Sequence, residues 1–365
     1  MADLTIARGT CYPLFAYDAA YTIDLDAAER RVLAAKERQT VKSKRRAPAF
    51  FEYRPRPLRV AQESVPVAIG SYRTAPSVEV VLYDFGAVSV SYAISIEGPL
   101  AVLPQLSADL WGNQELLADS RAQVERLLRT LGDAATRPRI ADFVEDYCVF
   151  QVEAFRDACD AALLWTEHAG LVAQILRAAP ASLSQQEVGD AIASRLSFGP
   201  SDATFIDTDG ALIFDPEGDD VRAVLEFANT QLLEMRFLDT QLDEALERAY
   251  GLVLRSRRLR LLPPYGPGSE QLAQLQLDSA ILFEQVTNAL KLIGEQYLAR
   301  VYGLVSRRFR INDWDAAITR KLQTLESIYA KLADRAATRR METLEWIIIL
   351  LIAASIVISL VAGTH

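Results

Sequence analysis

The C-terminal stretch from Trp346 to Gly363, WIIILLIAASIVISLVAG, constrains this chain most, because its eighteen residues carry no charge. At about 1.5 Å per residue, a helix of this length reaches about 27 Å and just spans the hydrocarbon core of a bilayer. The alternative is a buried helix of a globular domain. Such helices usually carry a polar stripe, which Ser355 and Ser359 alone do not form. The sequence therefore predicts a single transmembrane tail anchor.

Basic residues on one side of the predicted anchor set its orientation. Arg335, Arg339 and Arg340 precede the apolar stretch, and only two residues follow it. Under the positive-inside rule, this arrangement keeps the preceding part of the chain on the cytoplasmic side. Trp346 lies where an aromatic residue at the membrane interface is expected. The predicted location is the bacterial inner (plasma) membrane as a single-pass protein, with the mitochondrial inner membrane as the alternative.

The rest of the chain divides into two regions of different character. Residues 1–217 mix short apolar runs with amphipathic stretches, which predicts an α+β head domain with antiparallel strands. Residues 218–345 read as a coiled-coil-like region of long helices, and residues 346–363 form the anchor. The predicted fold class is therefore α+β: a mixed α/β head, then long antiparallel helices as a helical hairpin or coiled coil, then one transmembrane helix.

Within the head, short apolar runs alternate with turn signals. The expected strands and hairpins cover residues 10–17, 58–96, 143–155 and 203–214. Helices are expected from residue 23 and over 107–131, 170–179 and 185–196. The meander over 58–96 turns at Asp84-Phe85-Gly86, and the clearest hairpin turns at Asp209-Gly210. These patterns predict a largely antiparallel sheet with helices packed on it.

Three long helical stretches follow, at about 219–259, 269–306 and from 313 onward. In the last stretch, apolar residues alternate spacings of four and three as in a heptad seam: Ile318, Leu322, Leu325, Tyr329, Leu332 and Ala336. Short connections make consecutive helices antiparallel, so the first and third should end at the same side. The arginines expected to meet lipid headgroups are Arg255, Arg257, Arg258, Arg260, Arg335, Arg339 and Arg340, unless they only complement helix dipoles.

The sharpest enzymatic signal is the segment FIDTDGAL at 205–212. It resembles the first motif of haloacid-dehalogenase-type phosphotransferases, in which Asp207 would match the nucleophile and Asp209 the acid and base, with magnesium between them. Ala211 stands where that motif usually has threonine, and long helices follow where further strands would be needed. A hairpin with an Asp-Gly turn is the favoured interpretation, and no catalytic residue is assigned.

Composition excludes several other kinds of site. A net charge of −9 argues against bulk nucleic-acid binding. Cys11, Cys148 and Cys159 are odd in number and widely spaced, which implies no disulfide framework, and two histidines make a zinc site improbable. We expect no cofactor and no small-molecule substrate. The run KERQTVKSKRR at 36–46 is either a solvated loop or a phosphate-contacting segment through Lys36, Arg38, Lys42, Lys44, Arg45 and Arg46.

Several segments together resemble the required-for-meiotic-nuclear-division family, which shares the domain of unknown function 155. They are TCYPLFAYDAAYTIDLDAAERRVL, VVLYDFGAVSVSYAI, LLEMRFLDTQLDEALERAYGLV and METLEWIIILLIA, in this order along the chain. The resemblance implies a bacterial-type member. Eukaryotic members are associated with the mitochondrial inner membrane and support of mitochondrial translation, or with roles in microtubule and meiotic division. The resemblance implies no catalytic residues.

Two functional hypotheses follow. In the first, the chain is a membrane-tethered, self-associating scaffold whose head binds a ribosome, RNA or protein partner, in addition to membrane lipid. In the second, the head is a membrane-anchored, metal-dependent phosphotransferase or hydrolase that uses Asp207 and Asp209. The first is the favoured prediction, because long amphipathic helices, a heptad seam and an anchor are typical of scaffolds.

Overall fold

The computed structural model describes residues 4–37, 56–258 and 296–362. In the last helix it describes the side chains over 311–331 and 344–355 and a few of those between. Clustering of contacts divides the chain into unit 1, Met1–Phe237 with Glu284–Trp314, and unit 2, Leu238–Phe283 with Asp315–His365. The boundaries between these units fall within two long helices, after Phe237 and after Trp314. The sequence predicted a boundary at residue 217 instead. Each unit is described here by itself.

Unit 1 is built on one large sheet. Its strands are β1 (Thr5–Asp18), β3 (Leu58–Glu63), β6 (Ser77–Leu82), β7 (Ala87–Ser91), β8 (Ile94–Ser95), β9 (Gly98–Pro99), β11 (Val144–Phe155), β12 (Arg195–Leu196), β13 (Ala203–Ile206) and β14 (Gly210–Phe214). The order is β12-β13-β14-β11-β1-β7-β6-β3, with β8 and β9 also paired to β1. The two-stranded pairs are β2 (Thr22–Ile23) with β10 (Ala135–Thr136), and β4 (Ala68–Ile69) with β5 (Tyr72–Arg73).

The remaining described elements are helices. They are α1 (Leu25–Glu37), α2 (Leu103–Leu110), α3 (Gln114–Leu131), α4 (Leu163–Thr166), α5 (Ala169–Leu176), α6 (Gln185–Ala191), α7 (Asp219–Arg258), α9 (Gln296–Arg308) and α10 (Ile311–Ala362), with 3-10 turns η1 (Leu100–Val102) and η2 (Gly132–Ala134). The α+β class predicted for the head is confirmed, as are the meander, the hairpin at 203–214 and the strand at 143–155.

Strand β1 is the centre of the sheet because it is long and buries side chains on both faces. It pairs antiparallel with β11 from Ile6 to Tyr17 and with β7 from Leu14 to Asp18. On the far side of β11, strand β14 pairs in parallel, from Cys148 opposite Gly210 to Val152 opposite Phe214. The sheet is therefore mixed, whereas the local patterns predicted only antiparallel pairing.

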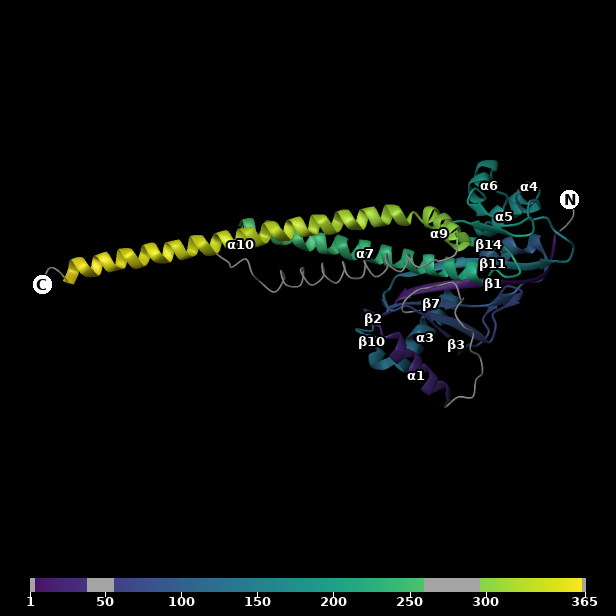
Figure 1. Cartoon of the computed structure of the whole chain (residues 1–365), viewed down its shortest axis with the longest axis horizontal. Helices are drawn as coiled ribbons and strands as arrows, with labels where there is room; N and C mark the ends of the chain where they lie inside the picture. The colour runs from purple at the N-terminus through teal and green to yellow at the C-terminus, as the bar shows by residue number, and fades with distance from the viewer. Residues whose placement is uncertain (1–3, 38–55, 259–295, 363–365) are drawn as a thin grey trace. The chain divides into compact units, whose positions relative to one another are not determined.

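Alternate residues of the strands face two different layers. One face, called the α3 face, packs on α1, α2 and α3 through a core that includes Phe15, Tyr17, Val80, Leu82, Val88, Val90, Phe150 and Val152. The other, called the α7 face, packs on α7 and α9 through Leu14, Tyr147, Val149, Ile213, Val224, Leu225, Val301 and Val305. In Figure 1, α1 and α3 lie on one side of the strands and the start of α7 on the other.

Helix α3 shows how local chemistry defines an element. Asn113 caps its first turn by accepting a hydrogen bond from the Leu116 amide at 3.0 Å. The chain leaves the helix at Gly132, whose φ of +54° suits a glycine. Between these ends, the buried residues recur at helical spacing: Leu116, Ser120, Gln123, Val124, Leu127 and Leu131. This single buried stripe places α3 flat against the sheet.

The prediction of a C-terminal transmembrane helix is wrong. Helix α10 continues to Ala362, but among the described residues no helix has the length and apolar character needed to cross a membrane. The predicted tail anchor and inner-membrane location, bacterial or mitochondrial, are corrected accordingly.

The turn between β6 and β7 contains a glycine that no other residue can replace. Gly86 has a φ of +98°, and a Cβ there would lie 1.7 Å from the carbonyl oxygen of Ala20. The Gly86 carbonyl in turn accepts hydrogen bonds from the amides of Ala19 and Ala20, each at 3.2 Å. The turn at 84–86 therefore attaches the end of β1 to the meander.

We expect Gly86→Ala to lower the free energy of unfolding by about 3 kcal/mol or more, because the overlap adds to the backbone strain. The measurement is urea denaturation followed by circular dichroism. Gly189→Ala in α6 is the matched control, since nothing lies within 4 Å of its added Cβ, and a helical Ala gains up to about 1 kcal/mol. Equal stability of the two variants would contradict this role of Gly86.

Candidate functional site

Asp207 lies at the turn of the β13–β14 hairpin, where the sequence suggested either a nucleophile or a turn. Its side chain is completely buried. Its backbone is held by its own amide, which donates to the Gly210 carbonyl at 2.9 Å, and by the Tyr147 hydroxyl, which donates to the Asp207 carbonyl at 3.1 Å. The hairpin thus fixes the carboxylate inside the protein rather than presenting it to solvent.

Two arginines from distant segments bind this carboxylate. Arg177, directly after α5, donates from Nε to Oδ2 at 2.9 Å, and Arg308, the last residue of α9, donates from Nε to Oδ1 at 2.8 Å. The Arg308 Nη2 also contacts Oδ1. Both carboxylate oxygens therefore hold a guanidinium group. We call Asp207, Arg177 and Arg308 the arginine clamp.

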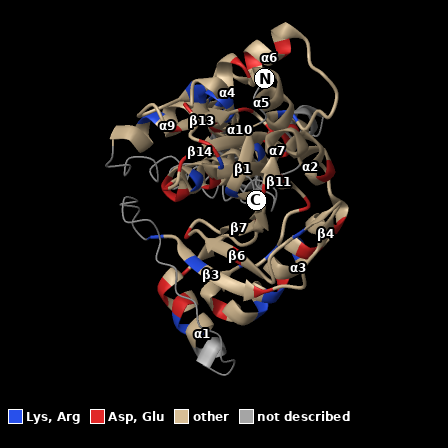
Figure 2. Ribbon diagram, turned by 90° about the vertical axis from the view of Figure 1, so that its right-hand side faces the viewer, with Lys and Arg blue, Asp and Glu red and all other residues tan. Residues whose placement is uncertain are grey.

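Acidic residues of α6 complete the charge balance around the clamp. Asp190 Oδ2 accepts from Arg308 Nη2 at 2.9 Å and also contacts Arg177 Nη2, and Glu187 contacts Arg177 Nη1. Hydrogen bonding to Arg308 lowers the pKa of Asp190. Figure 2 shows acidic positions on α6 above the basic positions near α4 and β13. The clamp therefore ties α5, α6, α9 and the hairpin together.

This geometry does not suit the phosphotransferase interpretation. A nucleophilic carboxylate needs a free oxygen facing substrate and metal, and both Asp207 oxygens carry arginine contacts. Asp209 is only half-buried, and its pKa is raised by burial and then by the charge of Asp207. Within the described ranges, no group of three or more metal-ligating side chains comes together. The clamp is a buried ion-pair centre.

A second buried charge centre lies on the α7 face, over β3, β6 and β7. Glu226 of α7 is completely buried; its Oε1 accepts from the Ser89 hydroxyl at 2.8 Å and its Oε2 from Arg59 Nη2 at 3.1 Å. Arg59 also contacts Glu79, and Arg222 stacks over the Tyr12 ring with its guanidinium carbon 4.4 Å from the centroid. On β3, β6 and β7, the side chains that face α7 thus include polar and charged groups, whereas the buried ones that face α3 are apolar.

Four of the buried polar residues of α7 recur every fourth position, namely Arg222, Glu226, Thr230 and Glu234, and Asn229 and Gln231 are buried beside them. This spacing puts the four on one side of the helix. Sequence reasoning missed this stripe, although its period was present in the printed residues, because charged residues at helical spacing usually mark a solvent-exposed side. We call it the α7 polar stripe.

Glu234 is the member of the stripe without a counter-charge. Its side chain is completely buried, and both carboxylate oxygens lack a hydrogen-bond partner. Burial, and then the nearby charge of Asp18, raises the pKa of Glu234 well above its usual value. Burial raises the pKa of Asp18 to about 7, and burial also raises the pKa of Glu145 to about 7 against the opposing effect of Arg236. Burial therefore raises the pKa values of several carboxyl groups at this end of the α7 face.

One cavity opens on the α3 face between α3 and the start of β11. Its volume is about 250 Å³, and its lining includes Tyr17, Gln114, Leu117, Arg121, Asp142 and Val144. The Tyr17 hydroxyl bonds the Ser120 hydroxyl at 2.6 Å, and burial raises the pKa of Tyr17 to about 12. Arg121 donates to the Ala141 carbonyl at 3.2 Å. Polar groups of this cavity are therefore held by hydrogen bonds to neighbouring side-chain and backbone groups.

Of the residues predicted to contact lipid or a partner, the structure describes only the side chain of Trp346. Side chains at 36, 255, 257, 258, 335, 339 and 340, and residues 38–46 and 260 entirely, lie outside the described residues. Trp346 is described, and its side chain is exposed on α10. The described structure does not test its predicted contact with lipid.

The fold and the clamp define an α+β protein with buried ion pairs in its head. A family model described as "Uncharacterized protein MJ0711, N-terminal domain" matches residues 8–220. This match covers more than half of the chain, so the chain belongs to that family. The uncharacterized protein MJ0711 of Methanocaldococcus jannaschii is 22% identical over 223 residues, which are 60% of this chain and 66% of that protein. No solved structure matches.

The expected kinship with the required-for-meiotic-nuclear-division family is therefore wrong. The matching family model runs from β1 to the start of α7, and that region carries the strand–helix and meander segments on which the resemblance rested. Short strand and turn patterns recur in many unrelated sheets. The most specific part of the resemblance, METLEWIIILLIA, falls outside the matched residues.

We expect Asp207→Asn to lower the free energy of unfolding by roughly 2–4 kcal/mol, because it leaves Arg177 and Arg308 without their shared counter-charge. Asp209→Asn, the same change two residues away, should alter stability by less than about 1 kcal/mol. Chemical denaturation of both variants gives the comparison. An Asp207→Asn protein as stable as the parent would contradict the clamp.

We expect Glu234→Gln to stabilise the protein more at pH 8 than at pH 5. A carboxyl group with a raised pKa in the folded state favours folding below its unfolded pKa, and that contribution is lost as pH rises through the folded pKa. The amide keeps the shape of the side chain without this dependence. Thermal unfolding at both pH values, with Glu247→Gln on the exposed side of α7 as control, measures the effect. An identical shift at both pH values would contradict a buried, protonated Glu234.

Proposed function

We propose that this chain is a non-catalytic interaction protein that self-associates through the helices of unit 2. The observation that carries the proposal is a run of exposed apolar side chains on α10: Met341, Leu344, Trp346, Ile347, Ile348, Ile349, Leu350, Leu351 and Ile352, each between 48% and 65% exposed. A contiguous apolar surface of this kind marks an interaction site.

The heptad seam supports a second copy of this chain as the occupant. Near its start the seam is covered within one chain, since Ile318 and Leu325 are buried in unit 2. The part of α7 in the same unit buries Leu238, Leu242, Ala245 and Ala249, again at spacings of four and three. Lys321 joins the two helices through ion pairs of 2.7 Å to Asp239 and to Asp243.

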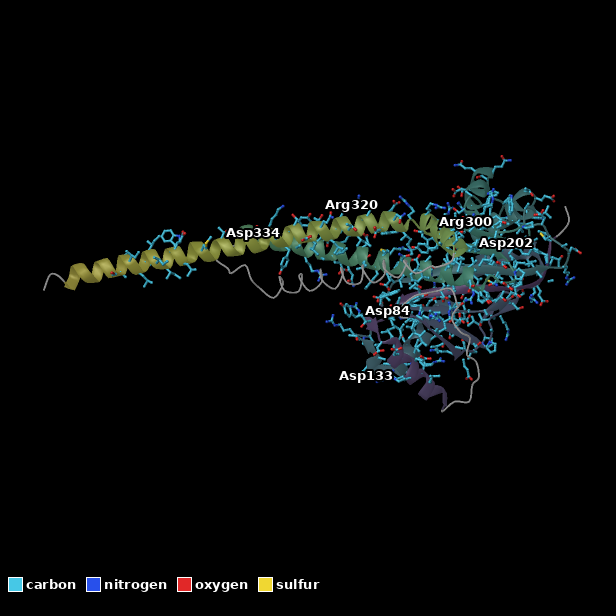
Figure 3. All side chains as sticks on the ribbon, in the orientation of Figure 1. Asp84, Asp133, Asp202, Arg300, Arg320 and Asp334 are labelled. Atoms are coloured by element: carbon cyan, nitrogen blue, oxygen red, sulfur yellow. The ribbon has the colours of Figure 1, made fainter. Side chains whose placement is uncertain are left out.

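Farther along, the seam is open. Counting on from Ala336 in steps of three and four, through Arg339 and Thr343, leads to Trp346 and Leu350, which are 65% and 64% exposed. Asp334, which is labelled on α10 in Figure 3, also has an exposed side chain beyond this buried start. Two copies that align α10 in the same direction would cover these positions by coiled-coil packing.

The described head supports the non-catalytic part of the proposal. Asp207 is held by the arginine clamp, and the cavity of about 250 Å³ beside α3 is smaller than typical small-molecule sites of about 300–1,000 Å³. A ribosome or RNA contact through the basic run at 36–46 stays a prediction, since that run lies outside the described residues.

The test is the mass of the purified full chain by light scattering. We expect an oligomer, and we expect Trp346→Glu with Leu350→Glu to shift it toward the monomer, because each copy then places two carboxylates in the seam. Gln323→Glu with Ser327→Glu is the matched control: it adds two carboxylates four residues apart on exposed positions of the same helix. The control should keep the parent mass.

Three results would contradict the proposal. The parent chain could be a monomer at all concentrations. The control pair could dissociate as much as the seam pair. The chain could be recovered as single copies bound to lipid vesicles, with no crosslinks between chains, which would mean that lipid rather than a second copy covers the apolar run.

A further inference from the structure

Two of the three cysteines meet across the central pair of strands. In the β1–β11 ladder, Cys11 lies opposite Phe150 and Cys148 lies opposite Pro13. The cysteines are thus diagonal neighbours on the α3 face, and their Sγ atoms are 3.3 Å apart. Nothing in the clamp, the polar stripe or the proposed self-association involves them.

The two thiols differ in their access to solvent. Cys11 is completely buried. Cys148 is half-buried and lines a small cavity together with Trp111, Asp146 and Asp209. Burial, followed by the hydrogen bond and charge of Cys148, raises the pKa of Cys11. Cys148 is therefore the sulfur that a small oxidant reaches first, and Cys11 is held next to it as a protonated thiol.

We propose that Cys11 and Cys148 form a reversible redox pair that a hydroperoxide converts to a disulfide between β1 and β11. The Cys148 thiolate attacks the peroxide, the O–O bond breaks, and a sulfenic acid and an alcohol, or water, are formed. Cys11 then attacks the Cys148 sulfur, the S–O bond breaks, and water leaves with the Cys11 proton. In balance, two thiols and ROOH give one disulfide, ROH and H₂O.

The strand register suits formation and reversal of this bond. Diagonal residues of an antiparallel pair have Cα atoms about 7–8 Å apart, at or just above the upper limit for disulfides. Closing the bond therefore requires a small shift of β1 against β11. Disulfides formed under such constraint are readily removed by thiol reductants, so the pair can cycle rather than lock permanently.

Formation of the bond would also affect the fold locally. Cys148 is the first β11 residue of the parallel pairing with β14, opposite Gly210, and a Cβ on Gly210 would lie 2.9 Å from the Cys148 carbonyl oxygen. A shift of β11 would be passed to the hairpin turn that carries Asp207 and Asp209. Through this turn, oxidation of the pair would also affect the arginine clamp.

The test uses the reduced full-length chain treated with hydrogen peroxide and then mapped by mass spectrometry of its peptides. We expect a Cys11–Cys148 crosslinked peptide, a mass loss of about 2 Da per chain, and recovery of both thiols with dithiothreitol. Cys159 is an internal control, because its Sγ only bonds the carbonyl of Asp160 at 3.4 Å. It should stay a free thiol at the same peroxide dose.

Two serine variants separate the steps. In Cys11→Ser, Cys148 should stop at sulfenic or sulfinic acid without a crosslink, whereas in Cys148→Ser the buried Cys11 should stay unmodified. The inference is overturned if the parent chain accumulates sulfinic acid at Cys148 without the crosslink. It is also overturned if disulfides form with Cys159 at an equal rate, since the observed proximity would then have no effect.

Discussion

A carboxylate that stays ionised away from water needs a counter-charge, and this requirement links distant segments of unit 1. Asp207 and Glu226 are both completely buried; Asp207 receives two guanidinium groups and Glu226 receives that of Arg59, which is far away in sequence. The cost of burying an unpaired ion is several kcal/mol. We therefore expect the α5–α6 segment, α9 and the hairpin to stabilise one another, and the start of α7 to be stabilised by β3 and β7.

The parts of the long helices that carry these charges belong to unit 1. Helix α9 brings Arg308 to the clamp and α7 brings Glu226 to the polar half of the sheet, and unit 1 includes all of α9 and includes α7 up to Phe237. In unit 2, the described parts of the helices bury a heptad stripe, and Lys321 forms ion pairs with two aspartates. Both units therefore combine apolar packing with ion pairs.

The sequence predicted the local elements, but it did not predict the features that depend on contacts between residues far apart along the chain. The hairpin at 203–214, the meander and the strand at 143–155 follow from alternation and turn residues, which act over a few positions. The parallel pairing of β11 with β14 and the use of Asp207 as an ion-pair centre depend on segments about 60 to over 100 residues apart, and no local pattern encodes them. The period of four in the α7 polar stripe was visible, but only the sheet opposite shows that the stripe is buried. The anchor was inferred from hydropathy alone.

The most direct test of this account is a double-mutant cycle between the hairpin and α9, using Asp207→Asn, Arg308→Gln and the pair together. The free energy of unfolding of each protein is measured by urea denaturation. If the clamp holds the unit together, the two changes are strongly non-additive, with a coupling energy of about 1–3 kcal/mol. A coupling energy near zero would show that Asp207 and Arg308 do not stabilise each other, and would contradict the central claim.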